Sequence, residues 1–316
     1  MGNKDITDFN EAQLRKRAAS KEELNICLTN NYAFQKIFKN EEIVKGFLIA
    51  LLHLKETDIE ELEVTDPFVE GEVKEEKEGI LDVKLILNGG KKINIEMQNT
   101  YQEDWAERSL FYNCRMFTEG LKKGESYYEL PPCIHVGILD FNYLKSPGFY
   151  HRILLKDDTT GELYSSKFQF HVIELSKIAT TKGKARKQDL YKWAKLISAS
   201  TWEEIREESE GNHYMEKVRD EMIKMSRDES ERYLYLREQM AIRDKASQLR
   251  SAENRGRREG ELLKLILQIQ KKIQKNKELH QIADEVEEEV IKIQPIYEAI
   301  KEHPEADKEE IYKMLK

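Results

Sequence analysis

Residues Gly79 to Gln98, GILDVKLILNGGKKINIEMQ, are the part of the sequence that says most about the fold. Apolar and polar residues alternate on both sides of Asn88-Gly89-Gly90. That tripeptide is a turn signal, because glycine and asparagine tolerate positive φ. The alternation predicts two antiparallel strands with one apolar face. That face consists of Leu81, Val83, Leu85, Leu87, Ile93, Ile95 and Met97.

The register of this hairpin brings two acids together. A three-residue loop pairs Leu87 with Lys91, and the same register places Asp82 directly opposite Glu96. Cross-strand Cβ atoms lie roughly 5 Å apart, and like charges at that separation destabilise a sheet. A divalent cation held by oxygen ligands would offset the repulsion, and Gln98 points the same way as Glu96. The alternative is a hairpin whose polar face is simply solvated.

The hairpin resembles the core of PD-(D/E)XK nucleases, in which an Asp ends one strand and a (D/E)-x-K motif lies on the next. More narrowly, the chain is similar to the recombination-promoting nuclease and transposase family, whose members usually carry E-x-Q there. The resemblance covers about residues 25 to 200. Its blocks are TNNYAFQKIF, VTDPFVEGEV, GILDVKL, INIEMQ, RSLFYNCRMFTEGLKKGESYYEL, PCIHVGILDF, FHVIELSKI and then Trp193.

The resemblance implies roles for the hairpin residues. Asp82 and Glu96 would be ligands of Mg²⁺ or Mn²⁺, and Gln98 would occupy the position where most of the wider group has lysine. A bound cation would polarise a scissile phosphate and lower the pKa of a bound water. Because glutamine has no proton to exchange at neutral pH, the resemblance implies a slow enzyme.

Asn31 departs from the family pattern, which commonly has aspartate at this position near the start of the first helix. An amide binds Mg²⁺ more weakly than a carboxylate and cannot act as a base. The substitution therefore indicates either an attenuated or inactive enzyme, or compensation by Glu41 or Glu42.

The charge distribution bears on nucleic-acid binding. The net charge is −8, whereas phosphate contacts need cations. Lys55 to Glu78 holds eleven acids and three lysines, but Ser176 to Ser200 holds seven basic residues and Asp189 as its one acid. That segment would track a nucleic-acid backbone, or it is a solvated loop and helix. The candidate contacts are Arg108, Lys84, Lys182, Lys184, Arg186 and Lys187.

Two of these candidates have alternatives of their own. Arg108 follows the E-x-Q strand, on a helix whose face includes Leu110, Phe111, Cys114 and Phe117. It would bind phosphate or pair with a nearby acid. Lys84 lies on the same predicted face as Asp82, where it would supply the charge that Gln98 lacks, or it is an ordinary solvated strand lysine.

The periodicity predicts an α/β fold with a central mixed sheet flanked by helices, plus an all-helical C-terminal region. The resemblance implies that the sheet and its helices form a PD-(D/E)XK-type core. We expect a nuclease domain over residues 1–205 and a helical region over 206–316 for dimerisation or partner binding. Helices are expected over 31–54, 104–123 and 190–198, and strands over 133–141 and 168–175. His171, Glu174 and Lys177 make the last strand either a binding strand or a core strand with polar ends.

The C-terminal region contains amphipathic stripes, such as Met215, Val218, Met222 and Met225. This pattern predicts helices that fold back on the core or pair with a second copy. The acidic tail after Leu279 favours a protein-interaction module over major-groove docking.

Together these features predict a Mg²⁺-dependent DNA endonuclease with little sequence preference. The resemblance implies a role in recombination, mobile elements or defence. The competing hypothesis is a nuclease-fold interaction protein that has lost cleavage through Asn31. A homodimer and an inhibitory protein partner are expected, but no membrane association, since no apolar run is long enough. Three widely spaced cysteines and the lack of an apolar leader predict a cytoplasmic location.

Overall fold

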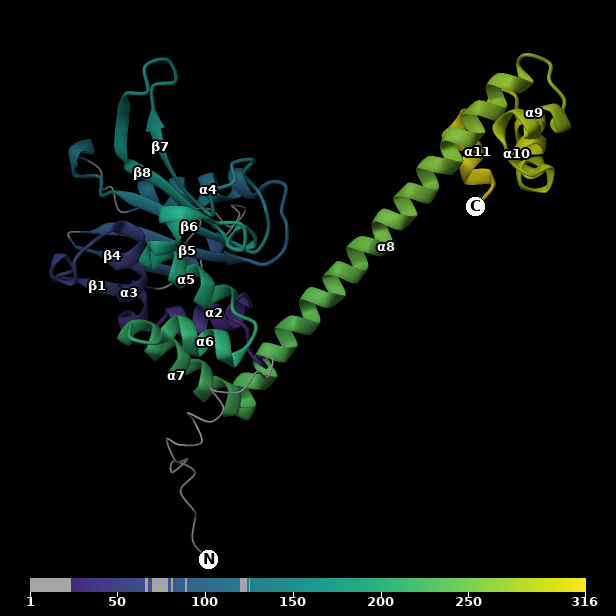
Figure 1. The fold of residues 1–316 in the computed structure, drawn as a ribbon. Helices are drawn as coiled ribbons and strands as arrows, with labels where there is room; N and C mark the ends of the chain where they lie inside the picture. Colours follow the sequence, from purple (N-terminus) through teal and green to yellow (C-terminus); the bar gives the residue numbers. More distant parts are fainter. Residues whose placement is uncertain are drawn as a thin grey trace, which may run out of the picture. The chain divides into compact units, whose positions relative to one another are not determined.

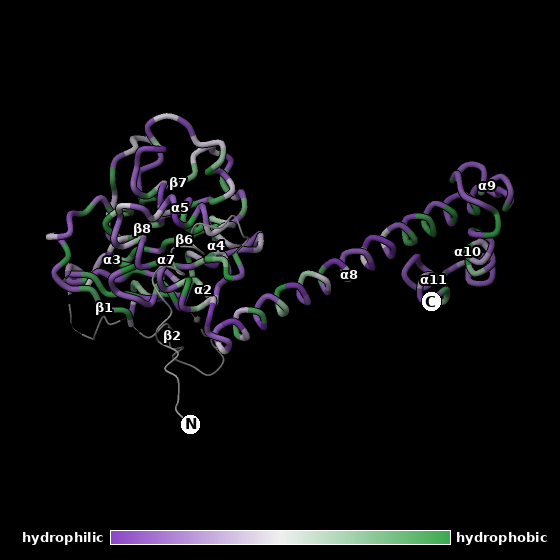
Figure 2. Tube along the Cα trace, turned by 60° about the horizontal axis from the view of Figure 1, so that its bottom comes forward, coloured by the Kyte–Doolittle hydropathy of each residue, from purple (hydrophilic) through white to green (hydrophobic). Residues whose placement is uncertain are grey.

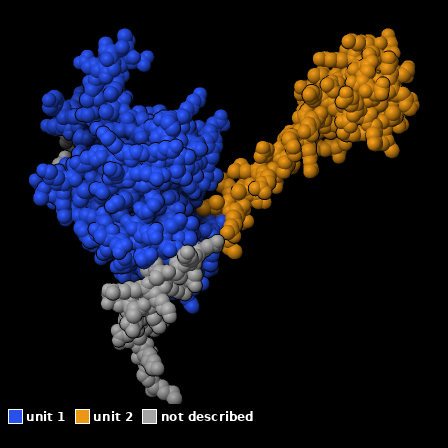
Figure 3. Space-filling model, in the orientation of Figure 1, with its two compact units in different colours: residues 1–239 blue, residues 240–316 orange. Residues whose placement is uncertain are grey.

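The computed structural model describes residues 24–65, 68–69, 79–80, 82–88, 90–119, 124 and 126–316. The chain forms two compact units, Met1–Gln239 and Met240–Lys316, which are coloured separately in Figure 3. The division falls further along the chain than the boundary at residue 205 expected from the sequence. Helices α6 (Trp202–Ser209) and α7 (His213–Arg227) therefore lie within the first unit.

The first unit contains a mixed sheet of six strands in the order β1-β4-β5-β6-β8-β7 (Figure 1). The strands β2 and β3 form a separate pair. The pairs β5–β6 and β6–β8 are parallel, and the other pairs are antiparallel. The mixed sheet agrees with the expected fold class. The strands are β1 Leu62–Thr65, β2 Phe68–Val69, β3 Gly79–Ile80, β4 Val83–Leu87, β5 Lys91–Gln98, β6 Cys133–Leu139, β7 Tyr150–Lys156 and β8 Leu163–Glu174.

The hairpin of β4 and β5 has the predicted register. Leu87 pairs with Lys91, so the loop between them has three residues. Asn88 and Gly90 adopt φ values of 27° and 90°, which are the positive angles that the turn signal anticipates. Leu81 of the predicted apolar face lies outside the described residues.

Helices cover both faces of the sheet. Ile93, Ile95 and Met97 of β5 pack into the main core with helices α2 (Asn31–Phe38) and α5 (Asp189–Ser198), whereas the alternate residues face α4 (Trp105–Thr118). Since side chains alternate along a strand, α4 lies on the opposite face of the sheet from α2 and α5, as Figure 1 shows. Figure 2 shows hydrophobic residues within this layered core.

The single helix predicted over residues 31–54 was wrong. Helix α2 ends at Phe38, and α3 (Glu41–Leu52) begins immediately after Asn40. The Asn40 side chain accepts hydrogen bonds from the backbone of Glu42 at 3.1 Å and Ile43 at 3.3 Å. Asparagine at this position is a strong N-cap, and its signal was hidden inside a continuous apolar pattern.

The strands predicted over 133–141 and 168–175 are present as β6 and the second half of β8, and the helix predicted over 190–198 is α5. On α4, however, the expected face was wrong: Leu110, Phe111 and Cys114 are exposed. The buried face of α4 consists of Trp105, Ser109, Tyr112, Asn113 and Met116.

The methionine stripe on α7 folds back on the core of the first unit. Met215, Val218 and Met222 are fully buried there. Helix α8 (Glu229–Ile273) begins in the same unit, where the Tyr235 hydroxyl accepts a hydrogen bond from the backbone of Cys27. Figure 2 shows mostly hydrophilic residues along its middle.

The second unit is entirely helical in the structure. The end of α8 packs with α9 (Leu279–Val286), α10 (Val290–Glu302) and α11 (Lys308–Met314) around a small apolar core. That core contains Leu265, Ile266, Ile269, Ile282, Ile293, Ile296, Ile300 and Ile311. Across the described part of the chain, no helix combines the length and the apolar character needed to cross a membrane.

Candidate active site

Asp82 and Glu96 meet where β4 and β5 pair. Val83 pairs with Ile95, and continuing that register by one residue places Asp82 opposite Glu96. The polar face of β5 is enclosed rather than solvated: Asn94, Glu96 and Gln98 are 0%, 2% and 7% exposed. Glu96 is therefore held away from water beneath α4, whereas Asp82, directly before β4, is half-buried.

Asp82 has hydrogen-bond donors on both carboxylate oxygens. Gln35 Nε2 donates to Oδ1 at 2.9 Å, and the backbone amide of Met97 donates to Oδ2 at 2.8 Å. Even so, burial and the negative charge of Glu96 raise the pKa of Asp82 to about 7. The protein thus orients this carboxylate without fully compensating its charge.

Glu96 is asymmetrically satisfied. Its Oε1 accepts from Gln98 Nε2 at 2.7 Å and from Arg108, with Nε at 3.1 Å and Nη2 at 2.9 Å. Its Oε2 has no hydrogen-bond partner within the described structure although the atom is buried. Burying a carboxylate oxygen without a hydrogen-bond donor costs free energy. A ligand bound at Oε2 would remove that cost.

His135, on the neighbouring strand β6, lies close to Glu96. Asn94 Nδ2 is 3.2 Å from His135 Nδ1, so the assigned amide orientation leaves Nδ1 as the acceptor and the proton on Nε2. That Nε2 is 3.7 Å from Glu96 Oε2, which is longer than a hydrogen bond. Burial lowers the pKa of His135 against the effect of Glu96, and the neutral ring therefore presents its N–H toward the carboxylate.

These residues fit a divalent cation that binds hard oxygen ligands. Asp82 and Glu96 supply two carboxylates, and the buried Asn31 Oδ1, like Glu96 Oε2, has no partner among the described residues. Asn31 lies one turn before Gln35 on α2, and so on the helix face that reaches Asp82. Among the described residues, no group of three or more His, Cys, Asp or Glu side chains is arranged so that it could hold a metal ion. Mg²⁺ tolerates so few protein ligands, because it retains several waters.

Arg108 and Lys84 are engaged by acids. Arg108 makes the ion pair with Glu96 that one of its two interpretations predicted, and its side chain is 35% exposed. The Lys84 ammonium lies 2.8 Å from Glu119 at the end of α4, and only 11% of its side chain is exposed. Lys84 is therefore neither a solvated lysine nor in contact with the carboxylate pair.

The basic segment lies outside the carboxylate cluster. Lys182, Lys184, Arg186 and Lys187 are exposed, in or beside the 3₁₀ helix Gly183–Lys187. Arg186 Nε donates to the carbonyl of Thr181 at 2.6 Å. In the described residues, no hydrogen bond or ion pair links these cations to Asp82 or Glu96, and their role as nucleic-acid contacts stays a prediction.

Sequence reasoning missed three residues of the site: Gln35, Asn94 and His135. Asn94 precedes Glu96 by two residues on the same strand face, and Gln35 follows Asn31 by four on a helix. Both spacings could have been recognised from the sequence alone. His135 carried no such signal, because its place close to Glu96 depends on the parallel pairing of β5 with β6.

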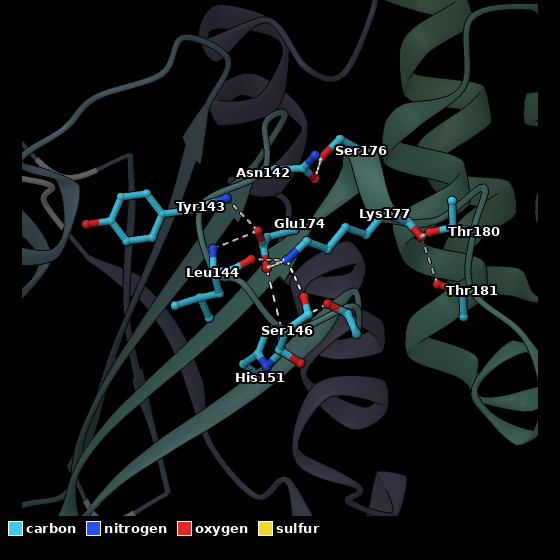
Figure 4. Close-up of polar contacts among 11 residues, drawn as sticks. Asn142, Tyr143, Leu144, Ser146, His151, Glu174, Ser176, Lys177, Thr180 and Thr181 are labelled. Atoms are coloured by element: carbon cyan, nitrogen blue, oxygen red, sulfur yellow. Dashed lines mark hydrogen bonds and ion pairs between the residues drawn. The ribbon is translucent and has the colours of Figure 1, made fainter.

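The polar residues of β8 form a separate structural cluster, so the core interpretation of that strand is the one that fits. Glu174 is fully buried, and its Oε2 is 2.7 Å from Lys177 Nζ. Lys177 also donates to the carbonyls of Leu144 at 2.6 Å and Ser146 at 2.7 Å (Figure 4). All three ammonium donors are therefore used within the protein.

We expect acid to destabilise the first unit through His171, which is 2% exposed and 2.8 Å from the Tyr150 hydroxyl. Burial and Arg152 lower the pKa of His171 to about 4. The folded pKa lies below the unfolded one, so stability is intact above about pH 6.5 and falls toward pH 4, by on the order of 3 kcal/mol at most. Urea unfolding followed by tryptophan fluorescence measures this, because Trp105, Trp193 and Trp202 all lie in this unit.

The matched variant is His171→Gln, which keeps a polar side chain beside Tyr150 but does not titrate. Its free energy of unfolding should fall less steeply between pH 6.5 and 4 than that of the wild type. An identical pH dependence in the two proteins would contradict the assignment to His171.

A mixed sheet with an Asp directly before one strand, E-x-Q on the next strand and α4 above Glu96 is consistent with a PD-(D/E)XK-type α/β fold. The family model for PD-(D/E)XK nuclease family transposases matches residues 28–252. The chain therefore belongs to this family, whose description assigns it a nuclease- or transposase-like role and whose members act on DNA with divalent metals. Comparisons with curated proteins and with solved structures gave no match.

Proposed function

We propose that this protein is a metal-dependent DNA endonuclease with little sequence preference, acting in recombination, mobile-element biology or defence. The observation that carries the proposal is the pairing of Asp82 with Glu96, whose buried Oε2 has no hydrogen-bond partner among the described residues. A structural carboxylate pair would be neutralised by protein donors, whereas this pair keeps an oxygen free for a cation.

Asp82 and Glu96 would hold Mg²⁺ or Mn²⁺, with Asn31 Oδ1 as a weaker oxygen ligand. When bound, the cation polarises the scissile phosphate and lowers the pKa of a bound water. Arg108 holds Glu96 through two contacts to its Oε1, and its partly exposed guanidinium can contact a phosphate oxygen. Gln35 and the Met97 amide fix the orientation of Asp82.

Gln98 positions the Glu96 carboxylate rather than activating the attacking water. Its amide donates to Glu96 Oε1 at 2.7 Å, so it holds the metal-binding carboxylate in place. It adds no positive charge where a lysine would, and the charge of Lys84 is already matched by Glu119. Arg108, which contacts Glu96, is therefore the cation that would stabilise charge on the phosphate, and we expect slow turnover.

Asn31→Asp should increase the cleavage rate. A carboxylate at this position adds a third anionic oxygen, which binds Mg²⁺ more tightly than an amide does. We expect a gain of roughly tenfold at limiting Mg²⁺, shrinking as Mg²⁺ is raised to saturation. Initial rates of plasmid nicking across a Mg²⁺ titration measure it, with Asn40→Asp, at the cap of α3, as the matched control. A rate unchanged at every metal concentration would remove Asn31 from the site.

The alternative function, a nuclease fold that binds a partner without turnover, rests on that same Asn31. The test is conversion of supercoiled plasmid to nicked and linear forms with Mg²⁺ or Mn²⁺, by the purified full chain. Metal-dependent conversion supports the nuclease. If only Asn31→Asp cuts, the site is real and this chain is its inactive form. Silence from both proteins favours the interaction protein.

We also propose that residues 206–316 serve dimerisation or partner binding, including binding of an inhibitory protein. What supports this is a helix with exposed apolar residues: Leu236, Met240 and Leu249 of α8 are 50%, 65% and 57% exposed. A dimer that presents two sites would make paired cuts. Sedimentation equilibrium of the full chain distinguishes a dimer from a monomer.

A further inference from the structure

Aromatic side chains gather where β5 ends and α4 begins. The rings of Tyr101 and Phe141 have centroids 5.4 Å apart at an interplanar angle of 72°, and Tyr101 lies 6.5 Å from Tyr143. Tyr143 in turn packs edge-on against Trp105 at 5.3 Å. Trp105 is 3% exposed, whereas Tyr101 is 60% exposed. The cluster thus has a buried base and one outward ring, that of Tyr101.

This cluster is linked by a backbone hydrogen bond to the end of β5, the strand that carries Glu96 and Gln98. The backbone amide of Asp140, which directly precedes Phe141, donates to the carbonyl of Gln98 at 2.9 Å. Tyr101 follows Gln98 by three residues, so their Cα atoms are at most about 11 Å apart. That reach corresponds to about three nucleotides along a strand, at roughly 3.4 Å each. A strand whose phosphate lies at Asp82 and Glu96 would bring a nearby base to Tyr101.

The aromatic cluster is held in place by hydrogen bonds within the protein. Glu174 Oε1 accepts hydrogen bonds from the amides of Tyr143 at 2.6 Å and Leu144 at 3.1 Å, which fixes the loop after β6 (Figure 4). The Tyr143 hydroxyl accepts from the amide of Ala106 at 3.3 Å, in the first turn of α4. A fixed ring loses little conformational entropy on binding. The exposure of Tyr101 also means that it contributes little to the core.

We propose that Tyr101, supported by Phe141, stacks on an unpaired base of the DNA strand bound at the Asp82–Glu96 site, so that single-stranded, gapped or frayed DNA is the preferred substrate class. In an uninterrupted duplex the faces of the bases are covered by their neighbours, and a tyrosine ring meets a free face only where a base is unstacked. Stacking is tolerant of base identity, which agrees with low sequence preference. The inference rests on the proposed function for the location of the strand.

The test measures binding without cleavage. A single-stranded oligonucleotide carrying 2-aminopurine and a fully paired duplex of the same sequence are titrated with the full chain in EDTA. Tyr101→Ala should weaken single-strand binding by roughly 5- to 100-fold, the loss typical of one base–aromatic stack, and should abolish the 2-aminopurine quenching. Tyr101→Phe keeps the ring, so it should stay within about twofold of the wild type. Duplex binding should be unchanged in both.

The matched control is Tyr164→Ala, at a tyrosine that is 84% exposed near the start of β8, far along the strand from Glu174. It should bind both DNAs as the wild type does. The inference is overturned if Tyr101→Ala binds single strands as tightly as the wild type, or if Tyr101→Phe loses as much as Tyr101→Ala. If the wild type cleaves DNA but Tyr101→Ala binds single strands as tightly as the wild type, only the base-stacking inference is refuted. Tyr101-dependent binding without cleavage at any metal concentration refutes only the nuclease.

Discussion

Asp82→Ala and Glu96→Ala should each abolish metal-dependent DNA cleavage, with a loss of about 1,000-fold or more. Each removes one of the two carboxylates held at the site, and a cation that stabilises charge by several kcal/mol accounts for a loss of this size. Both variants should fold, because removing one carboxylate relieves the repulsion between the pair. Initial rates of plasmid nicking, normalised to protein that shows native circular dichroism, measure the effect.

Glu107→Gln is the matched control for these variants. Glu107 lies in the first turn of α4 next to Arg108 and is exposed, so its charge is close to the site without forming part of it. Its cleavage rate should remain within about threefold of the wild type. Equal losses in Glu107→Gln and Glu96→Ala would mean that net charge, not metal binding, controls the rate.

Lys177→Met should destabilise the first unit by about 3–5 kcal/mol, the cost typical of leaving a buried charge unpaired. Glu174 is 0% exposed, and Lys177 is its cationic partner at 2.7 Å. The variant also removes the donor to the carbonyls of Leu144 and Ser146. Urea unfolding followed by tryptophan fluorescence isolates this unit.

Lys145→Met, at an exposed lysine in the same loop, controls for the change of side chain and should cost less than about 0.5 kcal/mol. The double variant Glu174→Gln with Lys177→Met should recover part of the loss, because no charge then remains buried. A Lys177→Met protein as stable as Lys145→Met would show that the pair does not hold the loop after β6.

Much of the fold could be predicted because the hairpin contains its own register. Alternation and the Asn88 turn fix which residues pair, and a one-residue slip would bury the acids with the core. Helix α4 was predicted as an element, but its buried face was not. Its inner residues include Ser109 and Asn113, and Asn113 donates to the carbonyl of Gln169. The spacing of apolar residues does not reveal this face, because some of its buried residues are polar and have partners on a distant strand.

Part of the site could likewise be predicted from local sequence, and part depends on long-range packing. The pairing of Asp82 with Glu96 follows from local sequence, whereas the enclosure of Glu96 depends on α4 and β6. Gly137 lies opposite Glu96 in the parallel pairing and leaves room for the Trp105 ring, which a Cβ there would meet at 2.2 Å. That packing brings the start of α4, and with it Arg108, over the carboxylates. No local pattern indicates such a contact between residues more than thirty positions apart.

The most direct test of the central claim is binding of Mn²⁺ to the full chain, measured by the loss of free Mn²⁺ signal in electron paramagnetic resonance. Wild-type protein should bind Mn²⁺ at a site that Mg²⁺ competes for and that Asp82→Ala and Glu96→Ala both remove, while Glu107→Gln retains it. Mn²⁺ binding that survives in both alanine variants, or its complete absence from the wild type and from Asn31→Asp, would contradict a metal site between these two carboxylates.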